Sequence, residues 1–136
     1  MIVLYAVVCE HAATREDGRL DVHGVFHQLY APGVPAQQGR LVLAVGLEWG
    51  PEERGRKEFR IDLMDPADSP VLSISGHTDV SDREGALGPP QTRLLLPMDD
   101  VIFPTEGSYR FVLRLGDDAI SLAPLHLITD PTAGQS

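Results

Sequence analysis

Hydrophobic and polar residues alternate along most of this chain, which is the pattern of a strand with one buried face. The clearest case is the segment 40–49, in which one side carries Leu41, Leu43, Val45 and Leu47. No window keeps a helical period over a useful length. The segments that predict strands are 2–12, 19–30, 40–49, 58–65, 70–76, 92–97, 101–104, 108–115 and 119–128.

Turn residues separate these segments at fairly even spacing. Asp17-Gly18 and Gly116-Asp117-Asp118 predict hairpin turns, and Asp99-Asp100 is a further pair of turn residues. About eight short strands with such turns predict an all-β fold, an antiparallel β-sandwich with an immunoglobulin-like or similar Greek-key arrangement. A partly closed β-barrel is the alternative. We expect residues 1–129 to form this single domain and the tail, 130–136, to be frayed.

Two residues add detail to this expectation. Tyr109 follows a glycine turn and opens a strand, as in the tyrosine corner of Greek-key sandwiches, so a structural role is expected. Pro97 has no N–H to donate within a ladder, so its strand should be short, bulged or at the edge of a sheet.

Composition narrows the class of protein. The 136 residues suffice for one domain with a hydrophobic core, and the formal net charge of −9 argues against binding to nucleic acids or anionic membranes. The single cysteine, Cys9, excludes an intramolecular disulfide and favours a reducing cytoplasm. The apolar start lacks the basic region of a signal peptide, and no stretch is long enough to span a membrane. The sequence therefore predicts a cytoplasmic protein.

Two stretches resemble a known family. "DGRLDVHGVFHQLYAPGVPA" (17–36), with its central Gly24 and following Pro35, and "EGSYRFVLRLGD" (106–117) are similar to a family of short bacterial proteins known as a domain of unknown function. The resemblance implies a small all-β fold. It implies no activity, cofactor or catalytic residue.

The common catalytic and phosphate-binding motifs are missing from the sequence, and no cofactor is expected. The histidines and the cysteine are therefore the first candidates for a metal-binding or catalytic site. His23 and His27 lie four residues apart, which is ~13 Å along a strand and too far for one metal ion. Cys9 and His11 lie two residues apart, which is the spacing that places two ligands on the same side of a strand.

A third ligand depends on the hairpin turn before His23. A two-residue loop, Asp17-Gly18, pairs His11 with Gly24, whereas a three-residue loop that includes Glu16 pairs His11 with His23. The three-residue loop sets the more apolar faces of the two strands side by side, and a one-residue slip would exchange those faces. We therefore favour it.

That register predicts a patch of Cys9, His11 and His23 that could bind a soft metal or respond to redox conditions. The competing interpretation, which we favour, is that Cys9 is a small hydrophobic residue and the histidines are ordinary strand residues. Further apolar residues would share the face of the patch, so a third layer or a partner should cover part of it. Self-association through this face or through a sheet edge is predicted, most simply as a homodimer.

The polar segment 76–92 is expected to be a long loop. Asp79, Asp82 and Glu84 could surround Ca²⁺, but their spacing is not that of an EF-hand, so solvated charges are the better interpretation. The first functional hypothesis is a non-enzymatic cytosolic module for protein interaction or assembly. The alternatives are a metal-binding or enzymatic protein that uses Cys9, His11 and His23, and a binder of a small ligand between the sheets.

Overall fold

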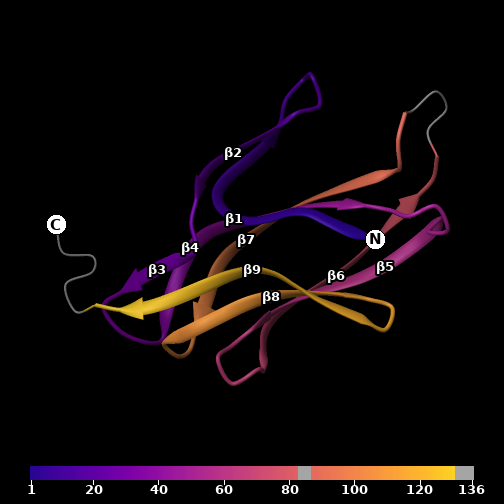
Figure 1. The fold of residues 1–136 in the computed structure, drawn as a ribbon. Coiled ribbons are helices and arrows are strands. Elements are labelled where there is room, and N and C mark those ends of the chain that lie inside the picture. The colour runs from indigo at the N-terminus through magenta and orange to yellow at the C-terminus, as the bar shows by residue number, and fades with distance from the viewer. Residues whose placement is uncertain (83–86, 131–136) are drawn as a thin grey trace.

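The computed structural model describes residues 1–82 and 87–130, which form two packed β-sheets (Figure 1). Nine strands build the sheets: β1 (Ile2–Thr14), β2 (Leu20–Val25), β3 (Gln28–Ala31), β4 (Ala36–Glu48), β5 (Gly55–Met64), β6 (Pro70–Val80), β7 (Gln91–Phe103), β8 (Gly107–Leu115) and β9 (Asp118–Thr129). The first sheet has the order β2-β1-β4-β7 and the second the order β3-β9-β8-β5-β6. The predicted all-β sandwich is confirmed. No helix that could cross a membrane occurs in the described part of the chain.

The hydrophobic core lies between the sheets and is centred on β4. The predicted inner face of β4 is almost completely buried along its length: Leu41, Leu43, Val45 and Leu47. The second sheet faces it with side chains of β5 and β8, among them Ile61 and Leu113. Because side chains alternate between the two faces of a strand, the intervening residues lie on the outer faces of the sandwich.

The segment 19–30, predicted as one strand, changes sheets halfway along. β2 pairs with β1 in the first sheet, whereas β3 pairs in parallel with the end of β9 in the second. Phe26 lies at the crossing, where its N–H donates to the Val8 carbonyl at 2.9 Å and its side chain packs against the core. The His126 N–H then donates to the His27 carbonyl at 2.9 Å. Alternation breaks at the crossing: Phe26 and Leu29 pack against the core, whereas Tyr30, expected on the same face as Phe26, is exposed.

The segments 92–97 and 101–104 were predicted as two strands, but the structure has one continuous strand here, β7, which ends at Phe103. Asp99 still pairs with β4, and Asp100 is accommodated within the strand at a φ of 56°. The prediction of a turn at these two aspartates is therefore wrong. β7 is the outermost strand of its sheet, as the missing N–H of Pro97 indicates.

The described chain ends at Asp130. Its N–H donates to the Ala31 carbonyl at 2.7 Å, so this residue is tied to the end of β3. The remainder of the tail expected to be frayed, 130–136, lies outside the described residues.

Tyr109 forms the predicted tyrosine corner. Its hydroxyl donates to the Thr105 carbonyl at 2.6 Å and accepts a hydrogen bond from the Thr105 N–H at 3.2 Å. Its ring is buried and meets Phe103 edge to face, with 5.0 Å between the ring centroids. These contacts fix the connection from β7 to β8, where the chain passes from one sheet to the other.

We expect Tyr109→Phe to lower the free energy of unfolding by about 1–3 kcal/mol, because the Thr105 N–H and carbonyl lose their partly buried hydrogen bonds with the Tyr109 hydroxyl. Urea denaturation measures the change. Tyr30→Phe is the matched control, since the Tyr30 hydroxyl contacts the exposed Gln28 side chain and its loss should cost less than about 0.5 kcal/mol. Equal losses in the two variants would contradict the structural role of Tyr109.

Candidate functional site

The hairpin between β1 and β2 has the register that brings two histidines together. His11 pairs with His23 across the strands, and the Arg15 N–H donates to the Arg19 carbonyl at 2.7 Å. Three residues therefore form the loop, and the last of them, Gly18, has a φ of +85°. A left-handed glycine at this position is typical of three-residue hairpin loops. The preference for a three-residue loop is confirmed.

The predicted patch of Cys9, His11 and His23 is assembled only in part. The two exposed imidazole rings are stacked, with 6.0 Å between their centroids. Cys9 is completely buried, and its Sγ lies 3.5 Å from the Val42 carbonyl, to which it donates. Within residues 1–82 and 87–130, no three His, Cys, Asp or Glu side chains converge as metal ligands would. A metal at this place stays a prediction.

Burial raises the pKa of the Cys9 thiol, and a hydrogen bond with the backbone of His11 offsets part of this effect. A buried thiol with a raised pKa forms little thiolate, the species that binds metals and reacts with disulfides. The environment of Cys9 therefore suits the interpretation as a small hydrophobic residue.

We expect the Cys9 thiol to be protected from an aromatic disulfide reagent in the native protein and to react at once after unfolding in urea. The release of the coloured thiol product measures both rates. Rapid reaction of the native protein would mean that the thiol is accessible, and would favour the redox interpretation of the patch.

The hairpin also lies over the outer face of the first sheet. Tyr5 places its ring against Gly46, where any added Cβ would be 2.3 Å from a ring carbon. Arg93 of β7 donates to the Tyr5 hydroxyl at 3.3 Å and to the carbonyl of Gly18, at the hairpin tip, at 3.0 Å. Val42, on the outer face of β4, is buried. A third layer or a partner was expected to cover part of this outer face. The Tyr5 ring and the hairpin tip supply some of that cover from the chain itself.

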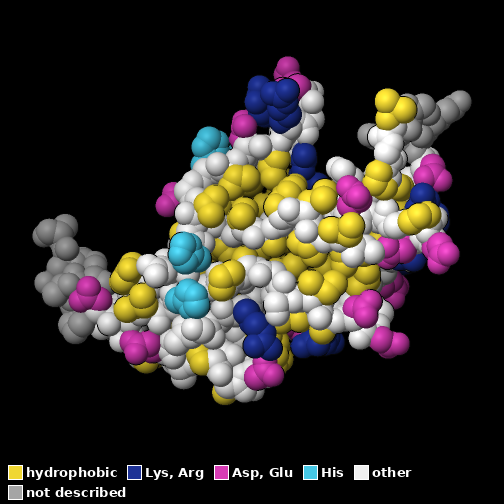
Figure 2. Space-filling model, viewed as in Figure 1, with side chains coloured by type: hydrophobic (Ala, Val, Ile, Leu, Met, Phe, Trp, Pro, Cys, Tyr) yellow, Lys and Arg dark blue, Asp and Glu magenta, His cyan; other side chains and the backbone are white. Residues whose placement is uncertain are grey.

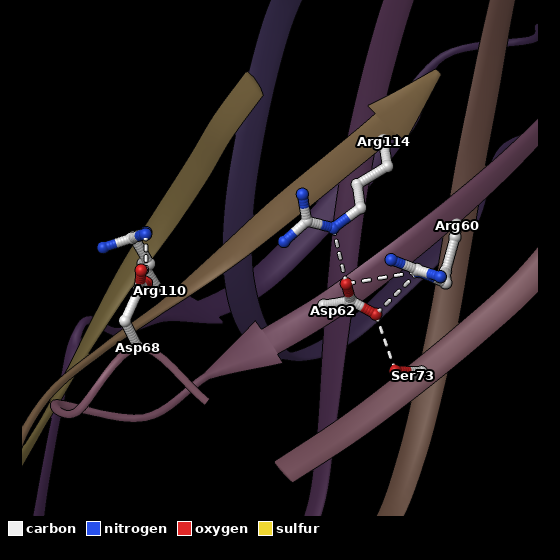
Figure 3. Close-up of polar contacts among 6 residues, drawn as sticks. All are labelled: Arg60, Asp62, Asp68, Ser73, Arg110 and Arg114. Atoms are coloured by element: carbon white, nitrogen blue, oxygen red, sulfur yellow. Dashed lines mark hydrogen bonds and ion pairs between the residues drawn. The ribbon is translucent and has the colours of Figure 1, made fainter. Parts of the chain in front are cut away.

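A buried carboxylate on the outer face of the second sheet was missed by sequence reasoning. Asp62 of β5 is only 2% exposed. Its oxygens accept hydrogen bonds from the Ser73 hydroxyl at 2.6 Å, from Arg114 Nε at 2.7 Å and from Arg60 Nε at 3.2 Å (Figure 3). In the sequence Asp62 looks like any outward polar residue of an alternating strand. Arg60 lies two residues before it on the same strand, but Arg114 and Ser73 become its neighbours only when β5 pairs with β8 and β6.

Opposing effects act on the pKa of Asp62. Burial raises it, but the hydrogen bonds from Ser73 and Arg114 and the charges of Arg60 and Arg114 together lower it below the ordinary value. The carboxylate is therefore ionised in the folded chain at neutral pH. Two guanidinium groups face one carboxylate, so the cluster carries a surplus of one positive charge.

We expect Asp62→Asn to lower the free energy of unfolding by about 2–4 kcal/mol at neutral pH, because two arginines lose a buried counter-charge. The pKa of Asp62 is lower in the folded than in the unfolded chain, so its contribution is complete above the unfolded pKa. It disappears as the pH falls through the folded value, and the gap between wild type and variant should close on acidification. Urea denaturation across this pH range measures the gap.

The exposed pair of Asp68 and Arg110 provides the control for that experiment. Asp68→Asn should change stability by no more than about 0.5 kcal/mol at any pH, because exposed ion pairs contribute little. A gap for Asp62→Asn that stays constant with pH would contradict the ionised state of this carboxylate.

The polar segment 76–92 is shorter as a loop than expected. β6 continues to Val80 and β7 begins at Gln91, so residues 76–80 belong to a strand. Asp82 forms an ion pair with Arg54 at 2.8 Å, and Glu84 lies outside the described residues. Nearby, Trp49 is buried and its Nε1 donates to the Thr92 hydroxyl at 2.8 Å.

One side of the sandwich lacks an outer strand along part of its length. β2 pairs only with the second half of β1, and β3 pairs only with the end of β9, so the first halves of β1 and β9 have no outer partner among the described strands. We call this side the β1 flank: residues 2–7 of β1 and 119–125 of β9. Figure 2 shows a continuous band of hydrophobic side chains over β1 and β9, with acidic side chains to its right.

Comparison with known proteins gives one result. The model of a family described as a family of unknown function (DUF6941) matches residues 4–128. This match confirms the predicted resemblance to a domain of unknown function. No curated protein and no solved structure matches the chain significantly.

Proposed function

Given that this chain belongs to the DUF6941 family, whose description assigns no activity, we propose that it is a non-enzymatic module for protein assembly. Its docking surface is the β1 flank, and the occupant is a second copy of the chain. We also propose that it acts in the cytoplasm, as the single cysteine predicts, and in a bacterium, as the family resemblance implies. A single observation carries the proposal: residues 2–7 of β1 form a wholly hydrophobic strand edge without a partner strand among the described residues.

The edge offers both backbone groups and apolar surface. Every second residue of an edge strand directs its N–H and C=O away from the neighbouring strand, where a further strand can pair with them. Ile2 is 60% exposed and Leu4 is 46% exposed. The pairing with β4 shifts between Val3 and Tyr5, so Leu4 is an extra residue at the edge. An exposed hydrophobic edge of this kind favours association.

The other edges of the sandwich are less suited to pairing. β7 carries Pro97, which has no N–H, followed by Asp99 and Asp100. β6 alternates serines with its apolar residues, β2 contains Asp21 and His23, and β3 has only four residues. Proline, charged residues and short length are the usual protections of edge strands. Along residues 2–7, β1 has none of these three protections and carries a single bulge, at Leu4.

A second copy is favoured over another partner because the edge is self-complementary. Most homo-oligomers are closed twofold dimers in which the same surface meets itself. Antiparallel pairing of β1 with its copy would bring together only uncharged side chains, although the chain carries a net charge of −9. The strong like charge of two copies would therefore lie away from the contact.

Leu4→Lys tests the proposal. We expect the wild-type chain to be a dimer at high micromolar concentration by light scattering coupled to size exclusion, and the variant to be a monomer. A buried, unpaired ammonium group at the dimer contact should weaken the affinity roughly a hundredfold or more. Ile102→Lys is the matched control, because Ile102 is 58% exposed on the edge of β7 and its change should leave the dimer intact.

Circular dichroism and urea denaturation establish that both variants fold. A monomeric wild type over the whole concentration range overturns the proposal. So does a dimer that survives Leu4→Lys, or one that is lost equally in Ile102→Lys.

A further inference from the structure

The two arginines beside Asp62 use only part of their hydrogen-bonding capacity. Arg60 and Arg114 are register partners on β5 and β8, and each donates its Nε to Asp62. Within the described residues, the Nη groups of both have no hydrogen-bond partner, and both side chains remain partly exposed. Figure 3 shows the two guanidinium groups on either side of the carboxylate. Asp62 thus orients two guanidinium groups whose outer donors stay free.

The charge balance of this cluster differs from that of the neighbouring pair. Arg110 of β8 and Asp68, in the turn between β5 and β6, form a one-to-one ion pair, which leaves no surplus charge. Arg60 and Arg114 share Asp62 alone, so one positive charge remains. In a chain with a net charge of −9, a fixed positive surplus is a local attraction for an anion.

A hollow in the surface gives an anion room to bind. It has a volume of about 610 Å³, and its lining includes Arg60, Arg114, Arg56, Ser75 and His77. Ser75 lies directly across from Arg60 on β6, so its hydroxyl is a further donor at the same place. Arg56 is already paired with Glu58 at 3.4 Å. The lining thus combines free guanidinium donors with a hydroxyl and an imidazole.

We propose that Arg60 and Arg114 form a binding site for a carboxylate group, with Ser75 and His77 beside it. A carboxylate is planar and carries one negative charge, so it matches both the fork of a guanidinium and the surplus of one positive charge. A doubly charged phosphate would exceed that surplus and would meet the nearby carboxylate of Glu58. The carboxylate belongs either to a small free acid or to the C-terminus of a peptide. This site is separate from the β1 flank and does not depend on dimer formation.

Nuclear magnetic resonance of the full chain tests the site through the side-chain Nε–H signals of Arg60 and Arg114. Acetate, inorganic phosphate and chloride are added separately at equal ionic strength. A short peptide with a free C-terminus is compared with its C-terminal amide, which identifies the source of the carboxylate. We expect saturable shifts with acetate or the free peptide, weaker binding of phosphate, and no saturable shift with chloride or the amide.

Three variants locate the binding. Arg60→Gln and Arg114→Gln should each weaken the affinity roughly tenfold or more, because a charged, two-pronged contact is lost. Arg60→Gln leaves Asp62 its bonds to Ser73 and Arg114, so the fold should persist even if Arg114→Gln does not fold. Arg110→Gln, outside the hollow, is the matched control and should bind as the wild type does.

Three results would overturn the proposal. One is the absence of a saturable shift with both acetate and the free peptide. The second is phosphate binding as tight as that of the carboxylates, because the surplus of one charge would then not select the ligand. The third is an equal loss of affinity in Arg110→Gln, which would indicate a diffuse effect of charge and not a site.

Discussion

Burial of β4 on both faces is the constraint on which the rest of the structure depends. Every residue from 41 to 47 is buried, although only the inner face belongs to the core between the sheets. The outer face needs small side chains and a cover, which Gly46 and the Tyr5 ring supply. β4 pairs with β1 along one edge and with β7 along the other, so its position determines where β1 and β7 lie. The hairpin tip is in turn held by Arg93 of β7.

The change of sheet between β2 and β3 explains why one side of the sandwich lacks an outer strand along part of its length. A single segment serves as an edge strand for half the length of β1 and then for the end of β9. The first halves of β1 and β9 are therefore left without an outer strand. The free hydrophobic edge of β1 and the band of apolar side chains beside it are thus consequences of the topology (Figures 1 and 2).

The two candidate surfaces have different physical characters. The β1 flank is uncharged and offers backbone groups together with apolar area, which suits a strand from another chain. The Asp62 cluster offers oriented guanidinium groups on a rigid sheet, which suits a single anionic group. Asp62 itself is buried and therefore orients the arginines without being available to a ligand. Neither surface requires the histidine patch, so the two imidazoles at the hairpin are left as neighbours on an exposed strand pair.

The sequence by itself determined the fold class, the inner face of β4 and the tyrosine corner, and of two possible hairpin registers it favoured the one that the structure has. Each follows from local information: the two-residue period, a turn with its glycine, or a comparison of apolar faces. Tertiary structure alone decided the crossing after Val25, the continuity of β7 through Asp99 and the setting of Asp62. The reason is that alternation reports which side of a strand is apolar, but not which strand lies beside it. Partners such as Arg114, 52 residues away from Asp62, become neighbours only when the sheets are formed.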